Sequence, residues 1–313
     1  MNEPSESLLR LGTRGSPLAR WQARWVRDRL LAAHPGLDVT LEIVRTSAEK
    51  FPDRPVETIG VGIFTREIDE ALLRGEFELA IHSLKDVPSE IPDEIVVAAV
   101  LERESPLDAF VSPHLSALDD LPPGARIGTG SPRRKAQILA RRPDLEVVPL
   151  RGNVDTRLRK MREEGLAGTV LALAGLRRLG REDAVTQVLD TEIMLPAVSQ
   201  GAVGVCTRRD DTRSRGLAAP LEHAESRRST DAERSFLRTL RGGCQVPAGA
   251  LARSVGGRLH LEAIIASPDG TSSVRGSREG DLERPAPLGE ALAAELLERG
   301  GGDILTRLRE AER

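Results

Sequence analysis

The sequence predicts an α/β fold of two similar lobes with mainly parallel sheets, followed by a small α+β domain. Three observations predict it. Short apolar strand patterns alternate with helix patterns over about the first 200 residues, which is typical of α/β sheets. One strand, turn and helix pattern occurs twice in that region, and after about residue 220 the pattern changes. A length of 313 residues suits two or three domains.

The first lobe begins with an apolar run that ends in glycine. Ser16 and Pro17 then have the character of a helix cap and a first helical position. The apolar side chains that follow share one helical face, namely Leu18, Trp21, Trp25, Val26 and Leu30. We expect the remaining elements in this order: a strand at Leu8 to Gly12, a strand through Val39, Leu41 and Ile43, a helix from Phe64 to Arg74 closed by Gly75, and a buried strand from Phe77 to Ile81.

The second lobe repeats this order of strand, turn and helix. The segment Ile127 to Pro132 is similar to Leu11 to Pro17, one residue shorter, and again a strand stops before a Ser-Pro helix start. A helix from Thr156 to Glu164, Gly165 and a strand from Thr169 to Ala174 follow. A chance match of a few small residues is the alternative. Two lobes are the better interpretation, because each helix start would offer backbone N–H groups to an anion near strand ends.

A different pattern begins after about residue 220. Glu222 to Leu240 can form a charged helix, and a glycine loop around Cys244 follows it. Ala248 to Ala266 supplies strands broken by two glycines, and a stretch rich in glycine, serine and proline runs from Ser267 to Leu288. A last helix is expected from about Gly289 to Leu296. These elements predict a small α+β domain.

Composition excludes several classes of function. The formal charge is −3 and aromatic residues make up 2% of the chain, so neither the electrostatics nor the stacking of a nucleic-acid binder is indicated. Two cysteines fit a reducing cytosol. The polar start Met1 to Ser7 predicts no secretion signal, and no apolar run has the roughly 20 residues of a membrane span. We therefore expect a soluble cytoplasmic protein.

Positive charge is concentrated in one segment. Residues 126–178 carry 13 basic and 5 acidic side chains, a local balance of +8. Nearly all basic residues of the chain are arginine, for which GC-rich codon usage is the plain explanation at surface positions. Arginine also grips carboxylates and phosphates through two parallel hydrogen bonds. This segment is therefore expected to attract anions.

Two residues are candidates for chemistry. Asp86 follows an apolar strand, adjoins Lys85 and precedes a proline turn, which is where a catalytic carboxylate would project; an ordinary turn-forming role is the alternative. Cys244 lies between two glycines and a proline, in a loop where a thiol would be exposed enough to react. Cys206, in an apolar run, is expected to be a buried small hydrophobe. The spacing of the histidines and cysteines gives no metal site.

The chain resembles the porphobilinogen deaminase family over nearly its whole length. Seven segments in order carry the resemblance: Thr13 to Ala19, His82 to Pro88, Gly128 and Thr129 with Ser131, Arg133 and Arg134, Leu150 to Val154 with Thr156 to Leu158, Ala174 to Leu179, Leu195 to Val198 with Gln200 to Ala202, and Gly242 to Pro247. The resemblance implies two lobes like those of periplasmic binding proteins and a third domain. It divides the chain into lobe 1 (1–101 and 202–220), lobe 2 (102–201) and a C-terminal domain (221–313).

The activity implied by the resemblance is a transferase reaction. Such enzymes join four porphobilinogen molecules head to tail with loss of ammonia, on a covalent dipyrromethane primer, and then release hydroxymethylbilane by hydrolysis. The matching positions imply Asp86 as the catalytic carboxylate and Cys244 as the thioether anchor of the primer. They imply Lys85, Ser131, Arg133 and Arg134 as cofactor ligands, and Arg14, Ser16, Arg151, Arg157 and Arg178 as substrate ligands. The implied enzyme is a cytoplasmic monomer whose partner is porphobilinogen, with no nucleic acid or membrane.

Departures from the family pattern fall in two places. Val61 stands in the glycine loop Gly60 to Phe64 where many members have lysine, and Gly130 and Pro132 replace a common serine and aliphatic residue. A non-catalytic two-lobed protein that closes on a small anion is the rival hypothesis. It would explain the repeated lobes and the arginines, but it gives no use for Cys244 or for a third domain.

Overall fold

A computed structural model describes residues 7–45, 65–114, 117–241 and 246–311 of the chain. The chain forms two compact units. One contains Met1–Arg103 together with Ala202–Arg227, and the other contains Glu104–Gly201 together with Arg228–Arg313. The chain therefore passes from one unit to the other at residues 103–104, returns at 201–202 and passes once more at 227–228.

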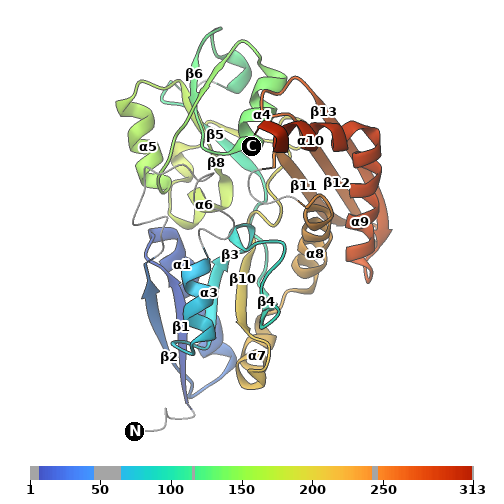
Figure 1. The fold of residues 1–313 in the computed structure, drawn as a ribbon. Helices are drawn as coiled ribbons and strands as arrows, with labels where there is room; N and C mark the ends of the chain where they lie inside the picture. Colours follow the sequence, from blue (N-terminus) through green and yellow to red (C-terminus); the bar gives the residue numbers. More distant parts are fainter. Residues whose placement is uncertain (1–6, 46–64, 115–116, 242–245, 312–313) are drawn as a thin grey trace. The chain divides into compact units, whose positions relative to one another are not determined.

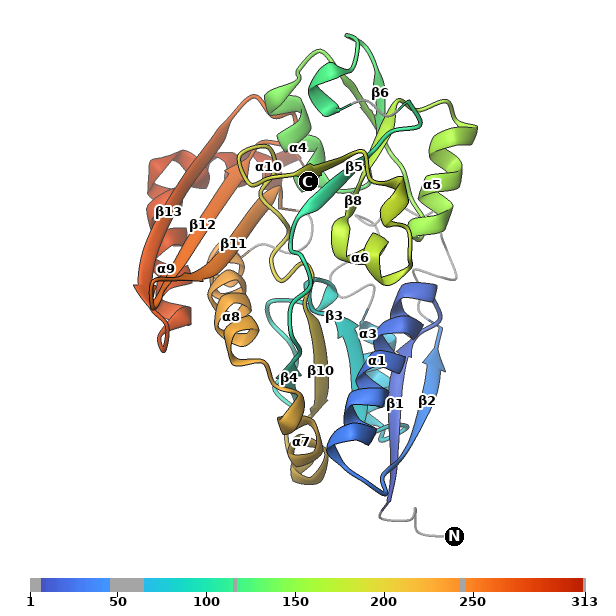
Figure 2. The ribbon, with the colours of Figure 1, turned by 180° about the vertical axis from the view of Figure 1, so that it is seen from behind.

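The described residues of the first unit build a sheet of five strands (Figures 1 and 2). Its order is β2 (Asp38–Val44), β1 (Leu8–Arg14), β3 (Leu79–Ser83), β10 (Val203–Arg208) and β4 (Ile95–Val100). β1 is parallel to both β2 and β3, whereas β10 is antiparallel to β3 and to β4. One strand thus runs against the other four, and it comes from a segment that is distant in sequence.

Helices cover both faces of this sheet. α1 (Pro17–Ala33) buries Val26 and Leu30 against Leu79 and Ile81 of β3, while α3 (Arg66–Leu73) buries Ile68 on the side of Ala80. Alternate strand residues point to opposite faces, so each face has its own apolar core. The expected apolar face of α1 differs in detail, because Gln22 is buried whereas Trp21 and Trp25 are only half-buried and stack on each other.

The second unit contains a sheet with an equivalent order. Among its described residues the order is β7 (Glu146–Val148), β6 (Arg126–Gly128), β8 (Gly168–Ala172), β5 (Asp108–Val111) and β9 (Gln187–Leu189). β6 is parallel to β7 and β8, and β5 is antiparallel to β8 and β9. α4 (Pro132–Arg141) contributes to the apolar core on one face, and α5 (Val154–Glu163) and α6 (Leu173–Arg178) contribute to the core on the other.

The internal repeat predicted from the sequence is confirmed at the two Ser-Pro helix starts. Ser16 accepts a hydrogen bond from the backbone N–H of Ala19 at 3.3 Å, and Ser131 accepts one from Arg134 at 3.4 Å. A steric constraint explains why each repeat has a glycine at the equivalent strand position. A Cβ on Gly12 would lie 2.3 Å from the Phe77 ring, and one on Gly128 would lie 2.7 Å from leucine side chains. Both strands therefore require glycine where they pass a large neighbour.

The last part of the chain forms a three-stranded antiparallel sheet within the described residues, β11 (Ala248–Val255), β12 (Arg258–Ala266) and β13 (Ser273–Asp281). α8 (Ala224–Thr239), α9 (Pro285–Leu296) and α10 (Gly302–Ala311) share one apolar core with the sheet. In Figures 1 and 2 the sheet lies beside α4, and Gly270 in the β12–β13 turn contacts that helix closely. A Cβ there would lie 2.5 Å from the backbone nitrogen of Ala140.

The predicted fold class is confirmed, with corrections at the level of elements. The stretch from Ser267 to Leu288 contains strand β13, and α9 begins at Pro285, four residues before the expected Gly289. The second C-terminal helix, α10, was not predicted. The strand expected at Phe77 to Ile81 is Leu79–Ser83, and Ala174 belongs to α6 instead of a strand. Within the part of the chain that the structure describes, no helix is long and apolar enough to cross a bilayer.

Candidate active site

A hollow opens at the end of β3 in the first unit. The ends of β1 and β3, the start of α1 and the turn after β3 all contribute to it. Of the described residues, its lining consists of Arg14, Ser16, Leu18, Ala19, Gln22, Ile81, His82, Ser83 and Asp86. Three residues predicted from the sequence, Arg14, Ser16 and Asp86, are thus brought together although up to 72 positions separate them in the chain.

Asp86 lies on a single 3₁₀ turn, η2 (Leu84–Asp86), that directly follows β3. Its side chain is 30% exposed, and its Oδ2 atom lies 3.7 Å from Nη1 of Arg14. This distance is longer than a hydrogen bond, so Arg14 acts on the carboxylate through charge. Lys85 is half-buried on the same turn and is not among the described residues that line the hollow.

His82 is a buried neighbour of this pair. Burial lowers the pKa of its imidazole to about 4, and the positive charge of Arg14 contributes in the same direction. His82 is therefore neutral near pH 7. The hollow then contains one carboxylate and one guanidinium, with a neutral imidazole behind them.

Gln22 and Ser83 line the same hollow, and neither was predicted from the sequence. A pattern in the sequence could have indicated Gln22. A glutamine follows six residues after each capping serine, as Gln22 after Ser16 and as Gln137 after Ser131. Both glutamines are buried and hydrogen-bonded, Gln22 to Ser83 and Gln137 to the backbone of Leu195.

The second unit contains a buried cluster of two arginines and an aspartate. Arg133 and Arg134, each 5% exposed, extend from the first turn of α4 to Asp108, which is fully buried on β5. Arg133 Nη1 lies 2.8 Å from Asp108 Oδ2, and Arg134 Nη2 lies 2.7 Å from Oδ1. Gln200 also donates a hydrogen bond to Asp108 at 2.9 Å. Two cations and one anion leave this cluster with one net positive charge.

Opposing effects act on the pKa of Asp108. Burial would raise it, but the charges of Arg133 and Arg134, with hydrogen bonds from Arg133 and Gln200, outweigh burial and hold the pKa well below its usual range. The carboxylate therefore stays ionised. The guanidinium groups also donate to backbone carbonyls, Arg133 to Leu195 at 2.7 Å and Arg134 to Val170 at 2.9 Å. The cluster thus ties α4 to neighbouring strands and loops, and a role of these arginines toward a ligand stays a prediction.

Three further predicted arginines belong to this unit and are half-buried. Arg151 adjoins Gly130, where an added Cβ would lie 3.7 Å from Arg151 Cγ and 3.2 Å from the carbonyl oxygen of Leu150. Arg157 lies on α5, whose cap Asn153 accepts a hydrogen bond from Thr156 N at 2.9 Å. Arg178 ends α6 and donates to the Gly201 carbonyl at 2.7 Å. Burial lowers the pKa of Arg178 to about 10, against the raising effect of Glu104.

The positive balance of residues 126–178 is reduced by acids from outside that segment. Arg141 pairs with Asp119 at 2.6 Å, and Arg177 pairs with Glu104 and Glu182. These are exposed surface pairs. The charge count along the sequence therefore overestimates the number of cations that could bind a ligand. In the fold, carboxylates from distant segments pair with some of these arginines.

Cys244 and the loop Gly60 to Phe64, including Val61, lie outside the described residues. The elements that flank Cys244 are α8, which ends at Thr239, and β11, which begins at Ala248. Cys206 is buried in β10 and packs in the apolar core beside α3, as predicted.

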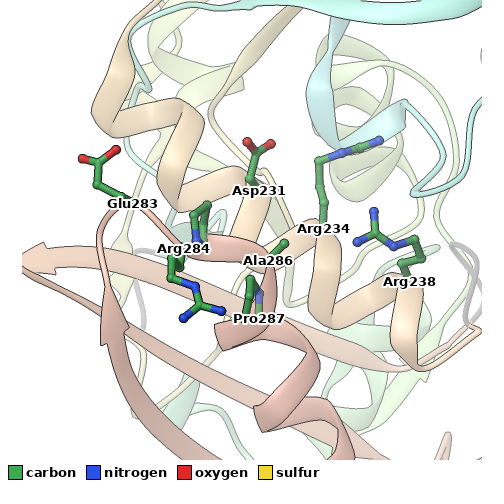
Figure 3. A pocket seen from close by; sticks show the side chains of 8 residues that line it. Asp231, Arg234, Arg238, Glu283, Arg284, Ala286 and Pro287 are labelled. Carbon is green, nitrogen blue, oxygen red and sulfur yellow. The ribbon is translucent and has the colours of Figure 1, made fainter.

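A larger hollow of about 340 Å³ lies between α8 and the start of α9 (Figure 3). Its charged lining consists of Asp231, Arg234, Arg238, Glu283 and Arg284. None of the residues predicted from the sequence is among the described residues that line it. In Figure 3 the Arg284 side chain lies apart from those of Arg234 and Arg238, so the three guanidinium groups do not surround a single point.

The fold and these sites define a class of protein: a two-lobed α/β protein with a carboxylate beside an arginine at one strand end and a buried, positively charged cluster on the other sheet. Comparison with known families narrows the class. Residues 9–216 match the profile described as porphobilinogen deaminase, dipyromethane cofactor binding domain, and residues 228–298 match the profile of the porphobilinogen deaminase C-terminal domain. The chain belongs to the porphobilinogen deaminase family.

Curated relatives agree with this membership. The chain is 50% identical over 304 residues to a porphobilinogen deaminase of Pelotomaculum thermopropionicum, covering 97% of both chains. It is 46% identical over 300 residues to that of Carboxydothermus hydrogenoformans, covering 96% of both. Among solved structures, the chain is similar to the methionine binding protein MetQ, with 14% identity and a TM-score of 0.46 over 69% of this chain and 89% of that one.

Proposed function

We propose that this chain is a hydroxymethylbilane synthase that joins four porphobilinogen molecules head to tail, with loss of ammonia, on a dipyrromethane cofactor, and releases the tetrapyrrole by hydrolysis. Family membership supports the transferase activity, the place in tetrapyrrole and heme biosynthesis and the cofactor. The observation that carries the proposal is the hollow in which Asp86 and Arg14 face each other at the ends of β3 and β1.

The residues present fit a dipyrromethane group, whose two rings carry four carboxylates. A polyanion of this kind requires fixed cations and N–H donors. The second unit offers the start of α4 capped by Ser131, a buried cluster with one net positive charge, and Arg151 beside Gly130. We propose Lys85, Ser131, Arg133 and Arg134 as cofactor ligands, and Cys244 as the covalent thioether anchor. When bound, the cofactor supplies the nucleophilic pyrrole carbon on which the product grows.

Asp86 acts as the catalytic carboxylate. Loss of ammonia from porphobilinogen places positive charge on the pyrrole nitrogen, and an ionised carboxylate facing that N–H stabilises the charge. Asp86 can also hold the proton that the pyrrole releases. The 3.7 Å separation from Arg14 leaves the carboxylate without a short hydrogen bond to that guanidinium, so its oxygen can bond a substrate N–H in the hollow.

Substrate carboxylates bind to arginines and to one helix start. We propose Arg14 and Ser16 in the first unit and Arg151, Arg157 and Arg178 in the second as these ligands. α1 supports the role of Ser16, because its first turn contains no acidic residue and its N-terminal N–H groups favour an anion. Arginine suits the binding of carboxylates, because its guanidinium group keeps its positive charge when it is partly buried against one.

We further propose a division of labour along the chain. Residues 1–101 and 202–220 supply the catalytic aspartate, residues 102–201 supply the arginine-rich lobe, and residues 221–313 carry the cofactor cysteine. The enzyme works in the cytoplasm as a monomer on a small-molecule substrate, without nucleic acid or membrane. The low aromatic content of 2% and the net charge of −3 support the exclusion of nucleic acid. Analytical ultracentrifugation would contradict the monomer if it gave a larger mass.

Two measurements test the proposal. Intact-protein mass spectrometry should find the polypeptide plus a two-pyrrole adduct, and the Cys244→Ser variant should lack the adduct. Incubation with porphobilinogen should release ammonia and yield a product that closes to uroporphyrin. A bare polypeptide mass with no ammonia release would contradict the proposal. The rival hypothesis of a non-catalytic anion-binding protein predicts that result, and it is not favoured because the family match extends through the C-terminal domain.

A further inference from the structure

Gln22 makes a partly buried hydrogen bond to Ser83, the residue that ends β3. Its side chain lies on α1 and is 2% exposed. Nε2 of Gln22 donates to Oγ of Ser83 at 2.9 Å, and the Ser83 hydroxyl lies 3.1 Å from Oε1 of the same amide. Both residues line the hollow that contains Asp86 and Arg14. Loss of this bond is costly for Gln22, because its buried amide would be left without a partner, whereas Ser83 is half-buried.

Ser83 is placed to control the position of Asp86. It is the last residue of β3 and directly precedes η2, on which Asp86 is the third residue. Within the described chain, its hydroxyl bonds the Gln22 amide and does not cap this turn. The start of η2 is also held by the backbone N–H of Leu84, which donates to the carbonyl of Ala202 at 3.0 Å. The turn that carries Asp86 is therefore fastened to α1 by a side-chain bond.

Gln22 connects this hydrogen bond to the helix whose start lies next to Arg14. Arg14 ends β1, Ser16 caps α1, and Gln22 lies six residues further along the same helix. The 3.7 Å contact between Arg14 and Asp86 is too long to fix their geometry by hydrogen bonding. The bond between Gln22 and Ser83 joins the segment that carries Arg14 and Ser16 to the segment that carries Asp86.

We propose that Gln22 is a positioning residue which, through Ser83, fixes the Asp86 carboxylate relative to Arg14 and Ser16. This inference rests on the proposed catalytic role of Asp86. Gln22 acts from the wall of the hollow, and its effect on the reaction passes through the turn. A misplacement of about 1 Å at a catalytic group can lower a rate by about 100-fold, which makes the role measurable.

Variants at both partners test the link. Gln22→Met keeps the length of the side chain and removes the amide, Ser83→Ala removes the hydroxyl, and Ser83→Thr keeps it. We expect kcat of the holoenzyme with porphobilinogen to fall by about 10–100-fold in Gln22→Met and in Ser83→Ala, with KM changed less than about twofold. Ser83→Thr should retain most of kcat. The double variant Gln22→Met/Ser83→Ala should be no slower than the slower single variant, because one bond is lost in each case.

A matched control separates positioning from stability. Thr207 lies in the same unit, is fully buried and donates to the backbone carbonyl of Glu78 at 2.8 Å. Thr207→Val removes this bond to Glu78, which directly precedes β3 and lies five residues before Ser83. We expect it to lower the urea midpoint as much as Gln22→Met does while leaving kcat unchanged. The cofactor content of every variant is checked by intact mass, so that loss of the cofactor is not mistaken for a slower step.

The outcomes distinguish the hypotheses. If Gln22→Met and Ser83→Ala keep normal kcat, or if their effects add in the double variant, the proposal is wrong and Gln22 only stabilises the fold. Should Gln22→Met fail to fold, the comparison of Ser83→Ala with Ser83→Thr decides, since equal kcat in those two would overturn the link. Asp86→Asn separates this inference from the proposed function: normal kcat in Asp86→Asn contradicts the role of Asp86, whereas a slow Asp86→Asn beside normal Gln22 and Ser83 variants contradicts only the positioning.

Discussion

Arg134 binds Asp108 through two nitrogens and one carboxylate oxygen: Nε lies 3.1 Å and Nη2 lies 2.7 Å from Oδ1. Arg133 holds the other oxygen at 2.8 Å, so one buried carboxylate compensates two buried guanidinium groups. We expect Asp108→Asn to lower the free energy of unfolding by about 3–5 kcal/mol, because it leaves buried charges without an anion. Urea unfolding measures this. Asp119→Asn, which removes the exposed partner of Arg141, should cost about 1 kcal/mol or less; equal losses in the two variants would contradict the interpretation.

Asp86→Asn should preserve the fold and slow the enzyme. The amide keeps the shape of the side chain but removes the negative charge that we propose faces the substrate N–H. We expect kcat to fall by about 10²–10⁴-fold, with an unchanged circular dichroism spectrum. Glu90→Gln changes an exposed carboxylate four residues further along and should leave kcat unchanged. Near-normal turnover in Asp86→Asn would remove Asp86 from the mechanism.

His82 makes the stability of the protein depend on pH. Its pKa in the folded protein is about 4, against 6.5 for the ordinary group. Between these values the unfolded chain binds a proton that the folded chain does not, so the free energy of unfolding falls as the pH drops from 6.5 to 4. The full loss is about 3 kcal/mol. In urea titrations, the free energy of unfolding of His82→Gln should fall less steeply as the pH drops. That of His114→Gln, whose substituted side chain is exposed, should fall as in the parent chain. Identical curves for His82→Gln and the parent chain would refute this.

Asp69 titrates in the same range with the opposite sign. Burial raises its pKa to about 6 from 3.8, so the folded chain takes up a proton at a pH where the unfolded chain has lost it. Its ionisation therefore lowers the free energy of unfolding as the pH rises from 3.8 to 6. Asp69→Asn should make stability rise more steeply with pH across this range. A less steep rise in the same urea titrations would show that the sign is wrong.

Gly12 and Gly216 should respond to alanine in opposite directions. A Cβ on Gly12 meets the Phe77 ring at 2.3 Å, so Gly12→Ala is expected to cost about 1–3 kcal/mol through overpacking. Combining it with Phe77→Leu should recover part of that loss. Gly216 lies in helix α7 (Thr212–Ala218) with nothing within 4 Å of an added Cβ, so Gly216→Ala should stabilise by up to about 1 kcal/mol. Thermal melts that shift both variants the same way would contradict the steric argument.

Elements with strong local patterns could be predicted from the sequence. The Ser-Pro starts of α1 and α4 and the glycine after α3 act within one helical turn, so they are visible in short windows. β13 could not be predicted in this way. Its sequence, Ser273–Asp281, is polar and contains two glycines, and its outer edge carries no partner strand among the described residues. α10 was missed for a related reason, because only Ile304 and Leu305 in it are buried.

The residues of the candidate site were likewise predictable only where a local sequence pattern marked them. Asp86 could be predicted because a polar residue at the end of an apolar strand is a local pattern. Asp108 could not, because it meets Arg133 and Arg134 only through the pairing of β5 with β8, far along the chain. Gln22 occupies a helix position where a polar side chain suggests solvent, and its bond to Ser83 spans 61 residues. Contacts that depend on the order of strands in a sheet can be predicted only when the fold is known, whereas helix caps and strand ends can be predicted from the local sequence.

The place of β10 has a consequence for synthesis on the ribosome. This strand, Val203–Arg208, fills the gap between β3 and β4, which are complete by Val100. Roughly a hundred more residues must be translated before the gap closes, and until then β3 and β4 expose unpaired backbone edges to any passing strand. Nascent chains released before residue 203 should therefore depend on chaperones and aggregate more readily than the finished polypeptide.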